Sequence, residues 1–141
     1  MTDGFEQISN KPGFMKHNGG ILFRKISNTE FEFKTTIDEN KLNSAGITHG
    51  GYICSIIDAG AGTAAHRASD NSPCVTISLD IKFIGPTKIG DEIKGFIKIQ
   101  KITKSMVFLI CYLESNAKIV ASASGVWKKL KKNIPDFGPG G

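Results

Sequence analysis

The sequence has few cysteines and no long hydrophobic run. Its three cysteines, Cys54, Cys74 and Cys111, are an odd number, lie within or beside apolar stretches and lack the spacing of metal ligands. The three histidines form no cluster with them, so we expect buried, reduced thiols and no metal site. No apolar stretch approaches the length of a membrane-spanning helix. Residues 1–14 lack a charged region followed by an apolar run, so we also expect no signal peptide and a cytoplasmic location.

Charge of one sign is only mildly in excess, with a formal net charge of +5 over 141 residues. A basic balance favours acidic partners, namely nucleic acid, a membrane surface or a small phosphorylated molecule. The lysines do not gather into one helical stripe, and no aromatic–basic motif of RNA-binding proteins is present. We therefore expect no nucleic-acid or membrane partner. With 40% hydrophobic and 22% charged residues, the composition is that of a single globular domain over residues 1–141.

Apolar and polar residues alternate along several segments, as is typical of half-buried strands. In the segment 75–84, Val75, Ile77 and Leu79 should face one side of a sheet, and Thr76 and Ser78 the other. The connections TKS and SNA are short enough for hairpins, so the last strands should pair antiparallel. Strands are predicted over residues 21–27, 30–37, 75–84, 91–103, 106–115 and 118–130.

Residues 49–67 predict a helix that is apolar or small on nearly every side, with Asp58 as the only charge before Arg67. Such a helix is usually enclosed by the rest of the protein, and an antiparallel sheet needs a cover for its apolar face. The predicted fold is therefore α+β, an antiparallel sheet of five to six strands wrapped around one long central helix. Residues 1–20 leave room for at most one short helix, and residues 131–141 should form a flexible tail.

One glycine pattern invites a different interpretation. Residues 60–65, GAGTAA, match the Gly-x-Gly-x-x-Ala fingerprint of dinucleotide-binding folds, and Asp80 lies twenty residues beyond Gly60. That fold requires a crossover helix before the next strand, but only TAAHRAS precedes the break at Asn71-Ser72-Pro73. We expect instead that these glycines let other parts of the chain pack closely against the helix.

The start of this helix, His49-Gly50-Gly51, offers backbone donors. The first N–H groups of a helix have no intrahelical partner and lie at the positive end of its dipole. Glycine allows a ligand to approach that backbone, so Gly50 and Gly51 are candidates for binding a carbonyl oxygen that becomes an oxyanion. The alternative is that these glycines only form a tight turn into the helix.

Asp58 is the candidate reactive group. Positions 54, 55, 61 and 62 hold no cation that could pair with it, and it lies away from the helix start. We expect a buried carboxylate without a partner on its own helix, which is costly. Either another part of the chain supplies a partner, or the carboxylate is kept for chemistry as a nucleophile or general base.

Helix geometry then constrains the site. Gly50 and Asp58 are eight residues apart, or about 12 Å along a helix that rises roughly 1.5 Å per residue. A nucleophile and an oxyanion donor must both lie within about 3 Å of the same reacting group. One helix cannot satisfy both requirements, so the site should combine Gly50 of one chain with Asp58 of a second copy, in a dimer at least.

Together these residues carry a family resemblance. The pattern Asn43-x-x-Gly46-x-x-His49-Gly50-Gly51, then Asp58 and the strand VTISLDIKFIGP, resembles the hotdog-fold acyl-CoA thioesterases of the phenylacetate-pathway type. The resemblance covers about residues 20–130. It implies a thioesterase that releases a carboxylic acid and free coenzyme A, with coenzyme A as part of the substrate and no separate cofactor. It also implies a cytosolic homotetramer built from two dimers.

The resemblance also implies roles for individual residues. Asp58 would attack the thioester or activate water, and the Gly50 N–H would polarise the thioester carbonyl. Asn43 and His49 would support the site, although His49 can equally be a helix-start residue that ties down the turn. Thr76 would help to position water or Asp58, and its alternative is an ordinary strand threonine.

Two other functions remain open from the residues alone. A hotdog-fold hydratase or dehydratase would pair an acidic residue with a histidine, for which only His66, eight residues after Asp58, is available. A non-catalytic acyl-CoA-binding protein is the third possibility. The acyl group itself stays undetermined among aromatic, medium-chain and hydroxylated types.

Overall fold

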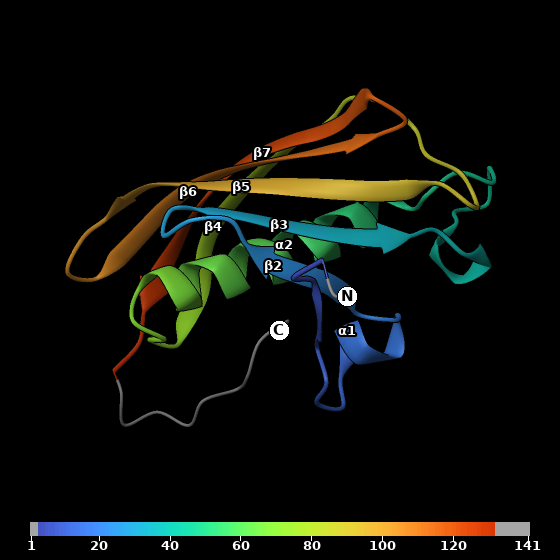
Figure 1. The fold of residues 1–141 in the computed structure, drawn as a ribbon. Coiled ribbons are helices and arrows are strands. Elements are labelled where there is room, and N and C mark those ends of the chain that lie inside the picture. Colours follow the sequence, from blue (N-terminus) through green and yellow to red (C-terminus); the bar gives the residue numbers. More distant parts are fainter. Residues whose placement is uncertain (1–2, 132–141) are drawn as a thin grey trace.

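The computed structural model of the chain describes residues 3–131 and shows a curved sheet with one long helix against its inner face (Figure 1). The seven strands form one antiparallel sheet in the order β1-β2-β3-β5-β6-β7-β4. In chain order the elements are β1 (Glu6–Ile8), α1 (Phe14–His17), β2 (Ile21–Lys25), β3 (Glu30–Thr36), a 3-10 turn (Glu39–Lys41), α2 (Gly50–Ala68), β4 (Cys74–Phe83), β5 (Glu92–Ile102), β6 (Met106–Ser115) and β7 (Lys118–Lys129).

The predicted arrangement of a sheet around a central helix is confirmed. Alternate side chains of β3, β5 and β6 point toward α2 and form the core with it, because these strands bury every second residue over most of their length. The helix contributes Ile56 and Ile57, which are fully enclosed, as are Phe33 of β3 and Trp127 of β7. The apolar pattern that predicted a helix over residues 49–67 differs from the observed helix by one residue at each end.

Two features of the sheet differ from expectation. A seventh strand, β1, pairs with β2 at one edge, in the segment where only a short helix was predicted. Three residues are too few to show a period-two pattern, so the sequence carries no signal for this strand. At the other edge, β4 pairs with β7, although β5 follows it in the chain. The segment 84–91 instead carries the chain to β5, whose partners are β3 and β6.

A β-bulge changes which side chains of β4 face the helix. The pairing with β7 shifts between Thr76 and Ser78, so the alternation of faces is interrupted there. Thr76 therefore reaches α2, and so does Leu79, whose side chain packs against the core. The prediction that Thr76 and Leu79 face opposite sides of the sheet is wrong, because strict alternation assumes a strand without a bulge.

The GAGTAA segment lies in the middle of α2, and of its two glycines Gly60 serves close packing, as expected, whereas Gly62 does not. A Cβ at Gly60 would lie 2.5 Å from the Phe33 ring, which is fully buried and has no room to move. A Cβ at Gly62 would lie 3.4 Å from Trp127 Nε1, an ordinary contact distance. The dinucleotide-binding interpretation fails because this segment does not form the required strand-to-helix turn.

Apart from Lys131, the predicted C-terminal tail over residues 131–141 lies outside the described residues. Within residues 3–131, no helix is both long and apolar enough to cross a membrane.

The two neighbouring helix glycines make a matched test of this packing. We expect Gly60→Ala to lower the free energy of unfolding by about 1–3 kcal/mol, because its methyl group overpacks the core against Phe33. Gly62→Ala should be neutral or stabilising by up to about 1 kcal/mol, because alanine favours the helix and its methyl group fits. Urea unfolding of both variants checks this, and equal effects at the two positions would contradict the packing account.

Candidate active site

The first turn of α2 is capped by the residue before it. His49 is the N-cap, and its Nδ1 accepts a hydrogen bond of 2.8 Å from the Gly51 N–H. The His49 carbonyl accepts from the N–H groups of Tyr52 and Ile53. Among residues 3–131, the Gly50 N–H finds no hydrogen-bond acceptor. Of the two predicted donors, therefore, Gly51 is occupied by the cap and Gly50 is available to a ligand at the positive end of the helix.

The loop before the helix is shaped by Asn43. Its Oδ1 accepts from the Ala45 N–H at 2.9 Å and the Ile47 N–H at 3.3 Å, and Gly46 adopts a left-handed conformation with φ of 81°. These bonds are those of an Asx turn, in which a side chain replaces a backbone acceptor. The Asn43 carbonyl oxygen thus organises the loop, which leaves the amide NH₂ as the group that can serve a ligand.

A buried lysine ties this loop to the sheet. Lys41 is 7% exposed, and its Nζ donates to the Thr36 carbonyl at 2.9 Å while its own carbonyl accepts from the His49 N–H at 2.8 Å. On the other side of the helix start, Thr87 Oγ1 donates to Thr48 Oγ1 at 2.6 Å. The residues on both sides of the helix tip are therefore held by buried polar contacts, which position the Gly50 N–H.

The helix tip opens into a cavity of about 350 Å³, here called the tip cavity. Gly50 and Asn43 both contribute to it, so the structure brings these two predicted residues together. The other walls are largely apolar. The lining residues are Asn43, Ile47, Thr48, Gly50, Ile53, Phe83, Ile84, Gly85, Pro86, Thr87 and Val120.

Asp58 lies two turns further along α2 and is paired with β4. Thr76 Oγ1 donates a 2.6 Å hydrogen bond to Asp58 Oδ1. This bond orients the carboxylate and leaves Oδ2 free to accept or attack. The bulge in β4 makes the contact possible, because it turns Thr76 toward the helix.

The expectation that Asp58 is buried is wrong for the single chain, and its partner comes from β4 rather than from its own helix. Its side chain is exposed, and the hydroxyl of Thr76 is its partner. Asp58 and Gly51 both lie on the side of α2 that the sheet does not cover. A helix surrounded by its own sheet still has one uncovered side, because the sheet curves around it without closing.

Asp58 opens into a second cavity of about 370 Å³, here called the aspartate cavity. Its lining residues are Phe14, Met15, Cys54, Ser55, Asp58, Ala59 and Leu79. None of them lines the tip cavity. The predicted site residues thus divide into a tip group (Asn43, His49, Gly50 and Gly51) and an aspartate group (Asp58 and Thr76), which the single chain does not bring together.

The cysteines are free thiols in different surroundings. Cys74 and Cys111 are buried, and burial raises the pKa of Cys111 to about 12. Cys54 is partly exposed and lines the aspartate cavity, so the expectation of three buried thiols holds for two of them. No group of three or more histidine, cysteine or acidic side chains within residues 3–131 is arranged to hold a metal ion.

Sequence reasoning missed several residues around the two cavities. Phe14 and Met15 belong to a helix of four residues, too short to show a periodic pattern, and they precede the region of family resemblance. Strict alternation places Leu79 on the face opposite Thr76, because the sequence gives no signal for the bulge between them. Phe83 was recognised as a strand residue, but only the tertiary structure places it beside Gly50.

Comparison with known proteins agrees with this architecture. The thioesterase superfamily profile matches residues 45–114. A Saccharolobus solfataricus protein named "Putative esterase SSO1253" is 31% identical over 109 residues, covering 77% of this chain and 72% of that protein. Acyl-coenzyme A thioesterase 13 of Mus musculus is 29% identical over 97 residues, covering 69% of each chain. The solved structure of the E. coli PaaI protein, from the phenylacetic acid degradation operon, superimposes with a TM-score of 0.65 at 19% identity, covering 72% of this chain and 73% of that one. These matches confirm the resemblance and the hotdog fold.

The helix cap yields a prediction that needs no substrate. We expect His49→Ala to lower the free energy of unfolding by about 1 kcal/mol, because the Gly51 N–H loses its acceptor. His49→Asn should retain most of the stability, because asparagine is a strong N-cap residue. Urea unfolding measures both variants. An asparagine variant as unstable as the alanine variant would show that His49 does not act as a cap.

Proposed function

The chain belongs to the thioesterase superfamily and is a thioester hydrolase, and we propose that its substrates are acyl-CoA thioesters. Water cleaves the bond between the acyl carbon and sulfur, which gives a carboxylic acid and free coenzyme A. The Gly50 N–H of one protomer polarises the thioester carbonyl, and Asp58 of its partner acts as nucleophile or general base. The free N–H at the helix tip and the carboxylate held by Thr76 support these roles.

The observation that carries this proposal is the position of β4. It is a ten-residue strand at the edge of the sheet, so one side of its backbone has no strand partner within residues 3–131. It also exposes large apolar side chains, with Ile77 at 54% and Phe83 at 59%. A long, apolar edge strand favours pairing with another chain. Pairing between two β4 strands extends the sheet across a two-fold axis.

Such pairing unites the two halves of the site. Thr76, near the start of β4, contacts Asp58, whereas Phe83, at its end, lies beside Gly50, where a Cβ would be 3.5 Å from the ring. In an antiparallel pair centred on the middle of β4, the start of one strand lies opposite the end of the other. Asp58 of one protomer then faces the tip cavity of its partner, as the distance along the helix requires.

The remaining parts of the proposal follow from the family resemblance. Asn43 supports the thioester through its amide group, and His49 fixes the helix tip. Two dimers associate into a cytoplasmic homotetramer. Coenzyme A enters as part of the substrate, with no further cofactor. A hydratase is disfavoured because its acid–histidine pair is not assembled here: His66, the histidine available to it, lines neither the tip cavity nor the aspartate cavity. Binding of acyl-CoA without hydrolysis would instead favour the non-catalytic alternative.

Asp58→Asn tests the reactive group directly. We expect kcat to fall by about 10³-fold or more, because an amide neither attacks the thioester nor accepts a proton from water. The fold should be unchanged, since the side chain is exposed and asparagine still accepts the Thr76 hydrogen bond. Thiol release from acyl-CoA measures activity. The matched control is Asp70→Asn, which removes an exposed carboxylate in the turn after α2, at a position that lines neither cavity, and it should retain activity. Near-full activity of Asp58→Asn would refute the mechanism.

Gly50→Pro tests the donor. Gly50 is the first residue of α2, where proline fits the helix and removes only the N–H, so kcat should fall by about 10²–10³-fold. Gly50→Ala keeps the N–H and should lose much less activity than Gly50→Pro, because a Cβ there meets Phe83 at an ordinary contact distance.

Mixing inactive Asp58→Asn and Gly50→Pro subunits should restore about a quarter of the wild-type activity, because half of random dimers are hybrids with one complete site each. No recovery in verified hybrids would exclude a shared site.

A further inference from the structure

We infer that α1 forms a wall of the acyl-binding site, and that Phe14 and Met15 select apolar acyl groups over hydroxylated ones. This inference rests on the proposed function, because it assigns the aspartate cavity to the acyl part of the substrate. Asp58 reacts at the acyl carbon, so the acyl group must extend from a point beside the carboxylate. The aspartate cavity, which opens at Asp58, provides that space.

The lining of the cavity suits an acyl chain better than coenzyme A. Phe14, Met15, Ala59 and Leu79 are apolar, and no lysine or arginine among residues 3–131 lines the cavity. Within the same range, its one charged lining residue is Asp58, whose carboxylate would repel the diphosphate of coenzyme A. The phosphates must therefore lie outside it.

The hydroxyl donors in and beside the cavity are already engaged. Ser55 Oγ donates to the Gly51 carbonyl at 2.7 Å within α2, and the Thr76 hydroxyl donates to Asp58. The Cys54 thiol is a weak donor. A hydroxyl group on the acyl chain would lose its hydrogen bonds to water and find no strong donor in return. The site should therefore prefer unsubstituted acyl groups.

The wall is held in place by the N-terminal segment. Met15 is 4% exposed and anchors α1, and the Gly20 N–H donates to its carbonyl at 2.7 Å. Gly20 has a φ of 64°, and a Cβ there would lie 2.9 Å from the Ile8 carbonyl, so the turn after α1 requires glycine. Pairing of β1 with β2 fixes the preceding segment. Figure 1 shows α1 on the same side of the sheet as α2.

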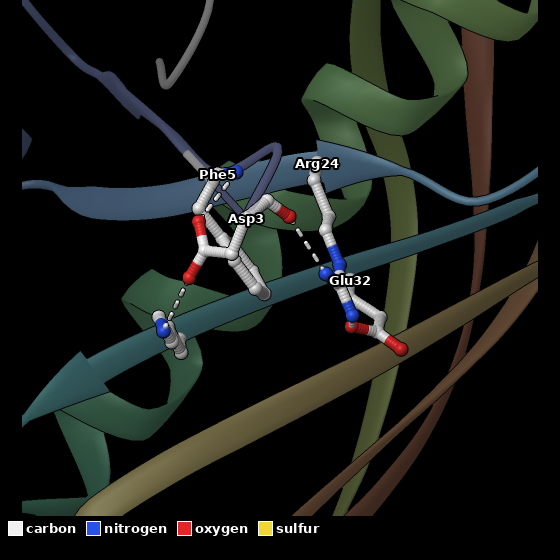
Figure 2. Close-up of polar contacts among 5 residues, drawn as sticks. Asp3, Phe5, Arg24 and Glu32 are labelled. Atoms are coloured by element: carbon white, nitrogen blue, oxygen red, sulfur yellow. Dashed lines mark hydrogen bonds and ion pairs between the residues drawn. The ribbon is translucent and has the colours of Figure 1, made fainter. Parts of the chain in front are cut away.

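A cluster around Phe5 fixes the start of this segment to the outer side of the sheet (Figure 2). The Phe5 ring lies 4.4 Å from the Arg24 guanidinium and 4.3 Å from Lys34 Nζ, a cation–π arrangement. Arg24 also donates to the Asp3 carbonyl at 2.8 Å and pairs with Glu32 at 2.8 Å. The Phe5 N–H donates to Asp3, which lowers the pKa of that carboxyl. The segment that carries α1 is thus attached to the sheet at both β1 and Phe5.

Phe14 is the residue best placed to contact the acyl group. It lines the cavity, yet 62% of it is exposed in the single chain, which is unusual for a phenylalanine. An acyl chain that extends more than a few carbons from the thioester would pack against the Phe14 ring and shield it from water. Because Phe14 is exposed, its replacement should leave the fold intact, whereas replacing the buried Met15 could unfold α1.

The test is a chain-length series. For Phe14→Ala and wild type, kcat/KM is measured with straight-chain acyl-CoAs from acetyl to decanoyl. We expect a loss of about 10-fold for the longer chains and no change for acetyl-CoA, because only long chains reach the ring. For wild type, 3-hydroxyacyl-CoAs should react between about 10-fold and 100-fold less efficiently than unsubstituted chains of the same length. The matched control is Phe108→Ala, on the outer face of β6, which should leave the chain-length profile unchanged.

Alkylation of Cys54 gives a second readout that does not depend on turnover. Iodoacetamide should label Cys54 alone, since Cys74 and Cys111 are buried. In the Asp58→Asn protein, octanoyl-CoA should slow this labelling at least about fivefold more than free coenzyme A does, because its chain occupies the aspartate cavity.

The two proposals fail in different ways. A wild-type protein that releases no thiol from any acyl-CoA refutes the thioesterase function, and Cys54 protection then decides alone whether the cavity binds acyl chains. If the wild type is active, three results would each overturn the assignment of α1. These are a chain-length profile of Phe14→Ala that parallels the wild-type profile, equal protection of Cys54 by octanoyl-CoA and coenzyme A, and a wild-type preference for hydroxylated chains.

Discussion

The length of a rigid helix is the constraint on which the candidate site depends. α2 carries a backbone donor at its first residue, Gly50, and a carboxylate eight residues later, at Asp58. At roughly 1.5 Å per residue the two groups are about 12 Å apart, far more than one thioester can bridge. The separation is visible as two cavities without a common lining residue. In the proposed mechanism a complete site therefore needs a second chain, and the helix sets where that chain would contribute its half.

β4 is the element that connects this constraint with assembly. One strand carries Thr76, which holds Asp58, and Phe83, which lies against Gly50. Its bulge turns Thr76 toward the helix, while its position at the sheet edge leaves its outer backbone side for a partner. The same ten residues can thus orient the carboxylate and pair two protomers so that opposite ends meet. In the single chain the carboxylate is exposed, so the fold carries no large cost for burying a charge there.

In the inferred arrangement, substrate selection falls to a part of the chain that the family motif does not include. The motif residues lie on the loop before α2, on α2 and on β4, where they supply a donor, a carboxylate and a hydroxyl. The space around the carboxylate is closed by α1, from a segment held by β1 and by the ring of Phe5. Separating the two tasks allows the acyl pocket to vary without disturbing the geometry of the reacting groups.

Local patterns in the sequence determined most elements and the chemistry of the candidate site. Alternation, apolar runs and turn signals together predicted six of the seven strands, apolar content predicted α2 to within one residue at each end, and helix geometry separated Gly50 from Asp58. These properties depend on neighbouring residues, so they can be read from a short window. The pairing of β4 with β7, the bulge at Thr76, the exposure of Asp58 and the wall formed by α1 were decided by the tertiary structure. Each depends on contacts between segments far apart in the chain, where the free energy of packing, rather than local preference, selects the arrangement.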